Sequence, residues 1–389
     1  PMCDNRHYIS EAPLSLNSVR RRVEAFLTAN GLRLAPLDRY VVVTRDEDGD
    51  EILAGGGLDG NVIKCVAVSE SARSEGLMNI LVSRLIAIAR EEGRESVKAF
   101  TKPENEGIFK SLGFTLLASS PKAILMENGS GGLPDYRKYL ESLARPGRNG
   151  AIVMNANPFT KGHRYLVEQA ASLVDNLYVI VVREDRSHFP YAERKAMIDA
   201  GCAGLDNVIV CEGSDYAISA ATFPTYFLKK LDDATDTQIA LDLDLFVNHI
   251  AKPLGVTVRF AGSEPEDALT RRYNELMAEI LPGTSVAVVR QAHQPDPELV
   301  KGSALRQAWR PMDFVEIPRL EQKGKPLSAT SLRRALDKGG FKEAMEYIPK
   351  STVPYLVADL AERALRLELD TTPKPGHVDR RDNGSHKYM

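Results

Sequence analysis

The stretch that decides the fold is Ala151-Ile-Val-Met-Asn-Ala-Asn-Pro-Phe-Thr-Lys-Gly-His-Arg-Tyr-Leu-Val-Glu168. It predicts a buried strand at 151–155 and an amphipathic helix at 162–174, joined by a turn that ends in Thr160-Lys-Gly-His163. Such a turn brings the N–H groups of a helix N-terminus, a histidine and a lysine together beyond the carboxyl end of a strand. This arrangement favours a bound phosphate, and Gly162 allows a ligand to approach the backbone closely.

Strands and helices continue to alternate after this stretch. Because strands separated by helices of this length form right-handed βαβ units, we expect a parallel sheet. The Leu241-Asp-Leu-Asp-Leu245 alternation is interpreted as part of a strand whose aspartates point outward, with a position facing the site as the alternative. The predicted strands are 177–182, 207–211, 239–246, 256–261, 286–290 and 313–317, and the predicted helices are 191–200, 219–231, 266–280, 328–338, 340–347 and 354–368.

A second anion-binding segment is predicted at Pro326-Leu-Ser-Ala-Thr-Ser-Leu-Arg-Arg334. It places Ser328 and Thr330 at the start of a helix, with Arg333 one turn further along. Hydroxyl groups, unpaired N–H donors and a guanidinium suit the outer phosphates of a triphosphate.

The first part of the chain is predicted to contain more strands than helices. Predicted strands at 40–44, 52–58, 62–68, 96–101, 114–118 and 122–127 are combined with helices at 15–29, 77–91 and 105–112. The glycine-rich run Asn128-Gly-Ser-Gly-Gly-Leu-Pro134 is the clearest linker. We therefore expect an α/β domain over 1–128, a linker with one helix over 129–147, a second domain over 148–348, and a C-terminal helix with a disordered tail over 349–389.

Composition narrows the classes of function. The 389 residues carry 50 Lys and Arg against 53 Asp and Glu, so a role in coating nucleic acid is disfavoured. No run approaches the roughly 20 apolar residues that span a bilayer, so no membrane partner is expected. The four cysteines are scattered without a Cys-x-x-Cys pair, which favours reduced thiols in a cytoplasmic protein and no tightly bound metal.

The two phosphate motifs resemble those of the nucleotidyltransferase superfamily, (H/T)xGH and a downstream ISSTxxR-like segment, over roughly residues 148–340. The resemblance implies a Rossmann-like parallel-sheet domain in which Thr160 and His163 contact the α-phosphate of ATP. It also implies that Ser328, Thr330 and Arg333 contact the β- and γ-phosphates. Thr160, His163 and Arg333 would then be the catalytic residues.

Further stretches resemble the citrate lyase ligases, among them Val182-Arg-Glu-Asp-Arg-Ser-His-Phe-Pro-Tyr-Ala-Glu-Arg194 and Gly262-Ser-Glu-Pro265. That family implies ATP-dependent acetylation of the thiol on the citrate lyase acyl carrier subunit, which bears a phosphoribosyl-dephospho-CoA group. Acetate, ATP and Mg²⁺ would be consumed or required, and AMP and pyrophosphate released. The implied ATP-binding residues are Asn155, Asn157, Pro158, Phe159, Lys161, Gly162, Arg194, Gly262, Ser328 and Thr330.

The first domain resembles GNAT-type acyltransferases at Arg73-Ser-Glu-Gly-Leu-Met78 and Asn105-Glu-Gly-Ile-Phe-Lys-Ser-Leu-Gly-Phe114. The resemblance implies that the turn before the helix binds the pyrophosphate of a coenzyme-A-like arm. The residues assigned to this arm are Val68, Arg73, Gly76 and Asn105.

Other functions stay open from the sequence. The chain could be an adenylyltransferase that acts on phosphopantetheine or a mononucleotide, although this leaves the first domain unexplained. It could also be a non-catalytic docking module for an acyl carrier. An N-acetyltransferase is disfavoured, because Met78 replaces a small residue and Phe109 stands near the position of a tyrosine often drawn as the general acid.

Overall fold

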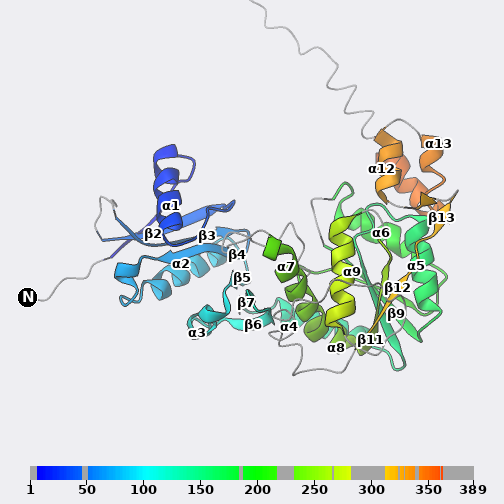
Figure 1. The fold of residues 1–389 in the computed structure, drawn as a ribbon, viewed down its shortest axis with the longest axis horizontal. Coiled ribbons are helices and arrows are strands. Elements are labelled where there is room, and N and C mark those ends of the chain that lie inside the picture. Colours follow the sequence, from blue (N-terminus) through cyan, green and yellow to red (C-terminus); the bar gives the residue numbers. More distant parts are fainter. Residues whose placement is uncertain are drawn as a thin grey trace, which may run out of the picture.

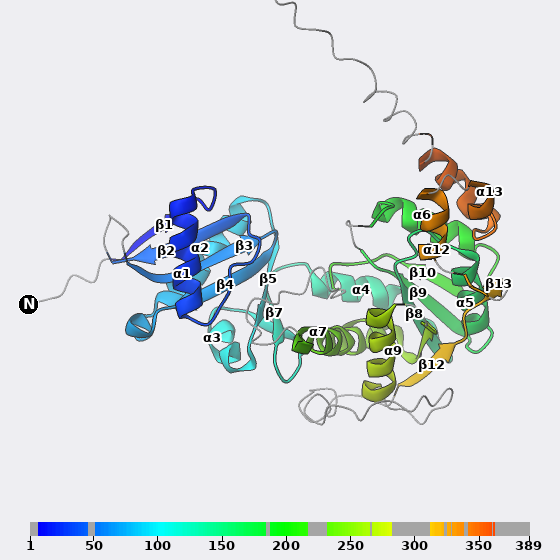
Figure 2. The ribbon, with the colours of Figure 1, turned by 45° about the horizontal axis from the view of Figure 1, so that its top comes forward.

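A computed structural model describes residues 7–45, 51–183, 187–216, 232–264, 267–281, 312–322, 325–327, 329–337, 341–359 and 361. Two α/β bodies follow one another along the chain, the first coloured blue to cyan and the second green to orange (Figures 1 and 2). The predicted α/β class is confirmed, with a mostly antiparallel sheet in the first body and a parallel sheet in the second.

Seven strands form the first sheet. Both of its faces carry apolar side chains, so both are covered by other parts of the chain. One face is covered by α2 (Leu77–Glu91) and α3 (Glu106–Ser111), while α1 (Asn17–Ala29) covers part of the other. The strand order is β1 (Tyr8–Glu11), β2 (Arg39–Thr44), β3 (Ile52–Asp59), β4 (Val62–Val68), β5 (Ser96–Thr101), β7 (Ile124–Gly129) and β6 (Thr115–Ser119).

The strands β4 and β5 are the parallel pair of this sheet, and they separate quickly. Their paired positions are Val62 with Lys98 and Ile63 with Ala99, at the beginning of β4 and in the middle of β5. The carboxyl ends of β4 and β5 are therefore not joined by ladder hydrogen bonds. The loop that follows β4 lies beside this opening.

Five parallel strands form the second sheet, in the order β10 (Val208–Cys211), β9 (Asn176–Val181), β8 (Asn149–Met154), β11 (Val256–Gly262) and β12 (Asp313–Ile317). Helices α5 (Lys161–Ala171), α6 (Tyr191–Cys202) and α12 (Ala329–Asp337) pack on one face. Helices α4 (Leu133–Leu143), α7 (Asp232–Leu245) and α9 (Ala268–Ile280) pack on the other. The order reverses direction at β8, which places a crevice between the carboxyl ends of β8 and β11.

Shorter elements complete the second body. A π-helical turn (Phe246–Ala251) and α8 (Lys252–Leu254) continue from α7. After β12 come a small hairpin of β13 (Glu321–Gln322) and β14 (Lys325–Pro326), then α12 and α13 (Phe341–Ala344).

Helix α7 is shared by the two bodies. Ile239 and Leu243 belong to the core of the second sheet, whereas Leu241 and Leu245 pack into a core with Phe100, Leu117 and Leu125 of the first. The helix lies between the two sheets in both views (Figures 1 and 2). The bodies are thus joined by buried apolar side chains as well as by the chain itself.

Polar contacts reinforce this junction. The backbone N–H of Ser119 donates to Asp244 Oδ2 at 2.7 Å, and burial raises the pKa of Asp244 to about 6. The Lys98 ammonium donates to the Asp215 carbonyl at 3.0 Å and lies 4.1 Å from the centroid of the Tyr216 ring. The Tyr216 hydroxyl donates to the carboxylate of Glu127, so β5, β7 and the segment after β10 are tied together.

The prediction of a strand at 239–246 was wrong, because these residues lie in α7 and the π-helical turn. Ile239, Leu243, Phe246 and Ile250 recur with helical spacing, and this longer period prevails over the five-residue alternation of leucine and aspartate. Asp242 accordingly faces the large cavity of the second body, not the outside of a sheet. The predicted helix 219–231 and strand 286–290 lie outside the described residues, as does the tail from Thr371.

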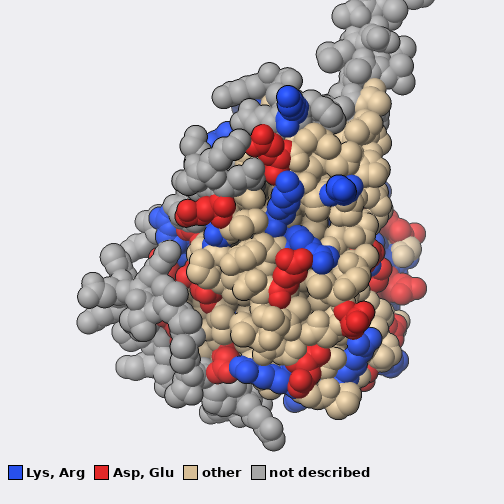
Figure 3. Space-filling view, turned by 90° about the vertical axis from the view of Figure 1, so that its right-hand side faces the viewer, with Lys and Arg blue, Asp and Glu red and all other residues tan. Residues whose placement is uncertain are grey.

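In the described part of the chain, no helix combines the length and the apolar character needed to cross a membrane. On the face of the second body drawn in Figure 3, basic and acidic side chains are interspersed among uncharged residues.

Candidate functional site

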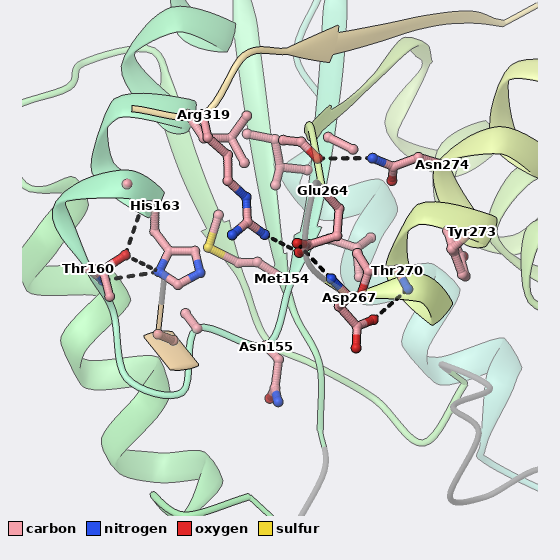
Figure 4. A pocket seen from close by; sticks show the side chains of 18 of the residues that line it. Met154, Asn155, Thr160, His163, Glu264, Asp267, Thr270, Tyr273, Asn274 and Arg319 are labelled. Atoms are coloured by element: carbon pink, nitrogen blue, oxygen red, sulfur yellow. Dashed lines mark hydrogen bonds and ion pairs between the residues drawn. The ribbon is translucent and has the colours of Figure 1, made fainter. Parts of the chain in front are cut away.

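A cavity of about 670 Å³ opens at the crevice between β8 and β11. One wall consists of the turn from β8 to α5, including Asn155, Thr160 and His163. The opposite wall consists of the β11–α9 turn and the segment after β12 (Figure 4). Crevices at this point of an open parallel sheet are where such sheets bind ligands.

Thr160 and His163 form a reciprocal cap at the N-terminus of α5. The Thr160 hydroxyl accepts from the His163 backbone N–H at 3.3 Å, and the Thr160 backbone N–H donates to His163 Nδ1 at 3.0 Å. Because Nδ1 accepts this hydrogen bond, the proton of the neutral imidazole resides on Nε2. His163 therefore presents an N–H donor to the cavity that it lines (Figure 4).

His163 is neutral near pH 7. Removal of the ring from water lowers the pKa of His163 to about 4, and the positive charge of Arg319 acts in the same direction. At a helix N-terminus, the Nε2–H of a neutral imidazole stabilises an anion by donating a hydrogen bond, with no transfer of a proton.

The downstream segment reaches the same turn. Arg333 of α12 donates to the Asn157 carbonyl, and its side chain lines the cavity. Gly162 lies against the Leu327 carbonyl, from which an added Cβ would be only 2.9 Å away. The missing side chain of Gly162 thus lets the segment before α12 pack directly on the start of α5.

The opposite wall is an ordered set of polar side chains. Arg319 donates to the Ser263 carbonyl at 2.7 Å and forms an ion pair with the buried Glu264. Asp267 caps α9 by accepting from the Thr270 N–H at 2.7 Å. Asn274 donates to the Gly262 carbonyl and to Glu316, each at 2.9 Å, and so joins α9 to β11 and β12. Hydrogen bonds and an ion pair thus connect the side chains of this wall to one another and to the backbone.

The structure brings many of the residues predicted for ATP together at this cavity: Asn155, Asn157, Thr160, Gly162, His163, Gly262 and Arg333 all line it. Thr330 lies in α12, and Ser328 lies outside the described residues. Pro158 follows Asn157 in a cis peptide bond, next to the lining residues.

Three of the residues predicted to bind ATP make contacts within the protein. Phe159 is fully buried in the core. Lys161 donates its ammonium protons to the Glu346 carbonyl at 2.8 Å. Arg194 is fully buried, and its guanidinium donates to the carbonyls of Phe189, Asn155 and Val182 at 2.9–3.0 Å. The expectation that Arg194 contacts phosphate is corrected on this geometry, because the buried guanidinium joins the backbone of Val182 and Phe189 to that of Asn155.

Sequence reasoning missed several residues that line the cavity, namely Arg259, Glu264, Tyr273 and Arg319, and it gave a site-facing position of Asp242 only as an alternative. The position of Arg319 could have indicated a site residue. It closely follows the predicted strand 313–317, and residues after parallel strands meet at the carboxyl edge of the sheet, where ligands bind. Glu264 lies in the Gly262–Pro265 segment that resembles the citrate lyase ligases, but the sequence analysis assigned it no role. Arg259 and Tyr273 had no sequence signal, since they come from the middle of a strand and of a helix.

The first body has a cleft of about 580 Å³ at the opening between β4 and β5. Arg73 and Lys102 line it together with Ser69, Ser71 and the end of α1. Val68 ends β4 directly before Ser69, and Asn105 donates to the Thr101 hydroxyl at 2.8 Å. Gly76 has a φ of +70° and starts α2, so its place in the turn depends on a left-handed backbone.

Comparison with known proteins identifies relatives of this chain. A family model described as "Citrate lyase ligase C-terminal domain" matches residues 149–356. The [Citrate [pro-3S]-lyase] ligase of Escherichia coli is 37% identical over 88% of this chain and 91% of its own length. The chain belongs to the citrate lyase ligase family. The Haemophilus influenzae ligase is 38% identical over 86% of this chain and 94% of its own length.

Partial similarities accompany this relationship. A phosphopantetheine adenylyltransferase of Streptococcus pyogenes is 29% identical over 37% of this chain and 96% of its own length. The solved structure of Escherichia coli ElaA covers 32% of this chain and 99% of its own, with 18% identity and a TM-score of 0.28.

The protonation state of His163 can be measured directly in this family member. We expect its imidazole resonance to stay constant between pH 5.5 and 8 and to titrate with a pKa of about 4, because burial and Arg319 disfavour the cation. NMR of the labelled chain measures this, with the resonance assigned by its loss in His163→Gln. A midpoint near 6.5, the ordinary pKa of histidine, would contradict the prediction.

Gly162→Ala tests the contact between α5 and the downstream segment. The added Cβ meets the Leu327 carbonyl, so we expect the KM for ATP to rise by about 5- to 20-fold, equivalent to roughly 1–2 kcal/mol. Gly107→Ala is the matched control, because Gly107 is also the second residue of a helix and an added Cβ there meets nothing within 4 Å. Equal ATP kinetics in the two variants would refute this role of Gly162.

Proposed function

We propose that this protein activates acetate with ATP and transfers the acetyl group to the thiol of the phosphoribosyl-dephospho-CoA group on the acyl carrier subunit of citrate lyase. The observation that carries the proposal is the neutral His163 at the N-terminus of α5, facing a cavity that Arg319 and Arg333 also line. Family membership supports the ligase reaction, and the cavity supplies the donors that it requires.

In the first step, an acetate oxygen attacks the α-phosphorus of ATP. A bond forms between that oxygen and phosphorus, and the bond to the bridging oxygen breaks, so its electron pair departs with pyrophosphate. Acetate is already ionised at neutral pH, and no general base is needed. The enzyme's contribution is to position the groups and stabilise negative charge.

The residues divide this work between two phosphate positions. His163 Nε2–H and the α5 N-terminus stabilise the α-phosphoryl group, while Thr160 holds the imidazole in the required tautomer. Arg333, one helix away, stabilises the leaving pyrophosphate together with Ser328 and Thr330. Mg²⁺ would accompany the pyrophosphate as its counter-ion, bound mainly by phosphate oxygens.

In the second step, the carrier thiol attacks the acetyl carbon of acetyl adenylate. A carbon–sulfur bond forms, the carbon–oxygen bond to phosphate breaks, AMP leaves and the thiol proton passes to solvent. The cleft beside Arg73 and Lys102 binds the nucleotide end of the prosthetic arm. Val68 and Gly76 lie at the two ends of the turn before α2, and Asn105 donates to Thr101 at the end of β5. The second body therefore binds ATP and acetate, and the first body binds the prosthetic arm that carries the thiol.

Isotope exchange tests the first step. We expect labelled pyrophosphate to enter ATP only when acetate is present, because the exchange requires reversible formation of acetyl adenylate. Omission of the carrier subunit should leave this exchange intact, and its addition should produce acetyl carrier and AMP. Exchange that required phosphopantetheine or a mononucleotide in place of acetate would refute the proposal in favour of an adenylyltransferase.

Arg73→Gln tests the role of the first body. Loss of one phosphate contact should raise the KM for the carrier about 10-fold and leave acetate-dependent exchange unchanged. Arg84→Gln is the matched control, since Arg84 lies in the same body, pairs with Glu91 on the surface and is not among the residues lining the cleft. If the KM for the carrier is unchanged in Arg73→Gln, this result contradicts the assignment of the prosthetic arm to this cleft.

A further inference from the structure

Arg259 is a buried cation in the middle of the parallel sheet. It lies on β11, where it is paired in register with Phe314 of β12 and Ala151 of β8. Its side chain is 4% exposed, and the guanidinium carbon is 4.3 Å from the centroid of the Phe246 ring. The strand therefore directs a positive charge toward the face covered by α7 and α9.

Two of the three guanidinium nitrogens of Arg259 lack a hydrogen-bond partner in the described part of the chain. Its Nε and Nη1 are buried without a hydrogen-bond acceptor, and it forms no ion pair there. Asp242 is close enough to interact electrostatically, but its carboxylate accepts from the Tyr273 hydroxyl. Buried guanidinium groups are strongly unfavourable unless an anion compensates them.

Arg259 lines two adjoining spaces. One is the large cavity, whose far wall carries His163. The other is a small cavity of about 20 Å³ with largely apolar walls that include Val153, Ile180 and Ile250. A volume of this size holds about one group as large as a water molecule or a methyl group.

We propose that Arg259 binds the carboxylate of the acid substrate and that the small cavity holds its methyl group. This assignment rests on the proposed function and names the acid subsite of the same site. The three substituents of a carboxylate carbon diverge in one plane. One oxygen can therefore contact Arg259, the other can face the α-phosphorus in the large cavity, and the methyl group can enter the apolar space.

The same geometry explains selectivity for a two-carbon acid. A longer alkyl chain exceeds the small cavity, and its accommodation requires Val153, Ile180 or Ile250 to move within a packed core. A bound carboxylate supplies charged acceptors for the unbonded Nε and Nη1 of Arg259, whereas an uncharged analogue such as acetamide brings no negative charge to them.

Acetate-dependent pyrophosphate–ATP exchange tests the assignment. In Arg259→Gln we expect the KM for acetate to rise by about 10- to 100-fold, while the KM for ATP stays within about twofold of wild type. Arg259→Lys should recover part of the loss, because it keeps the charge but not the two-donor geometry. Arg272→Gln is the control, because Arg272 pairs with Asp236 within the chain and should change neither KM.

A second variant covers the case in which Arg259 variants do not fold. Ile250→Val enlarges the small cavity by about one methylene, so the ratio of kcat/KM for propionate over acetate should increase about 10-fold. An unchanged ratio overturns the placement of the methyl group.

The outcomes separate this inference from the proposed function. Wild-type exchange with an unaltered acetate KM in folded Arg259→Gln overturns the assignment of Arg259 only. An equal rise of the KM for ATP and for acetate also overturns it, because it indicates a general distortion. Wild-type protein without acetate-dependent exchange overturns the proposed function and the acid subsite together.

Discussion

Burial of α7 on two sides is the constraint on which the rest of the structure depends. Leucines two residues apart on this helix, Leu241 and Leu243, enter different hydrophobic cores. A helix with apolar side chains around most of its circumference must be covered all round, and here each body supplies one cover. Displacement of one body would expose the apolar side chains of the other, so the two sheets are joined as one unit around the helix.

The shared helix also carries polar residues into both bodies. Asp244 accepts the Ser119 N–H at the edge of the first sheet, and Asp242 lines the cavity of the second. Two sides of the same turn of this helix thus contact the junction and the candidate active site. The position of the first body is therefore linked to the wall of the cavity through α7, not only through the linker before α4.

The polar side chains of the cavity are held mainly by hydrogen bonds to backbone groups. His163 is held by the Thr160 cap, Arg333 by the Asn157 carbonyl, and Arg319 by the Ser263 carbonyl and Glu264. Side chains already fixed in this way need little reorganisation when charge develops on a phosphoryl group, which is the basis of electrostatic catalysis. Arg194 contributes from one layer further out by satisfying the carbonyls of the loop after β9.

The sequence by itself determined the class of the fold, the strand–turn–helix over Thr160–His163 and the family. Thr160, Gly162 and His163 are close neighbours in the chain, so their geometry follows from a strand, a turn and a helix start. The sequence did not determine α7, because alternation over Leu241–Leu245 imitates a strand, nor the role of Arg194, whose acceptors are backbone carbonyls that leave no mark on composition. Only the tertiary structure placed Arg259, Asp242, Tyr273 and Arg319 around one cavity. Their proximity results from strand order and helix packing, and no local spacing in the sequence encodes it.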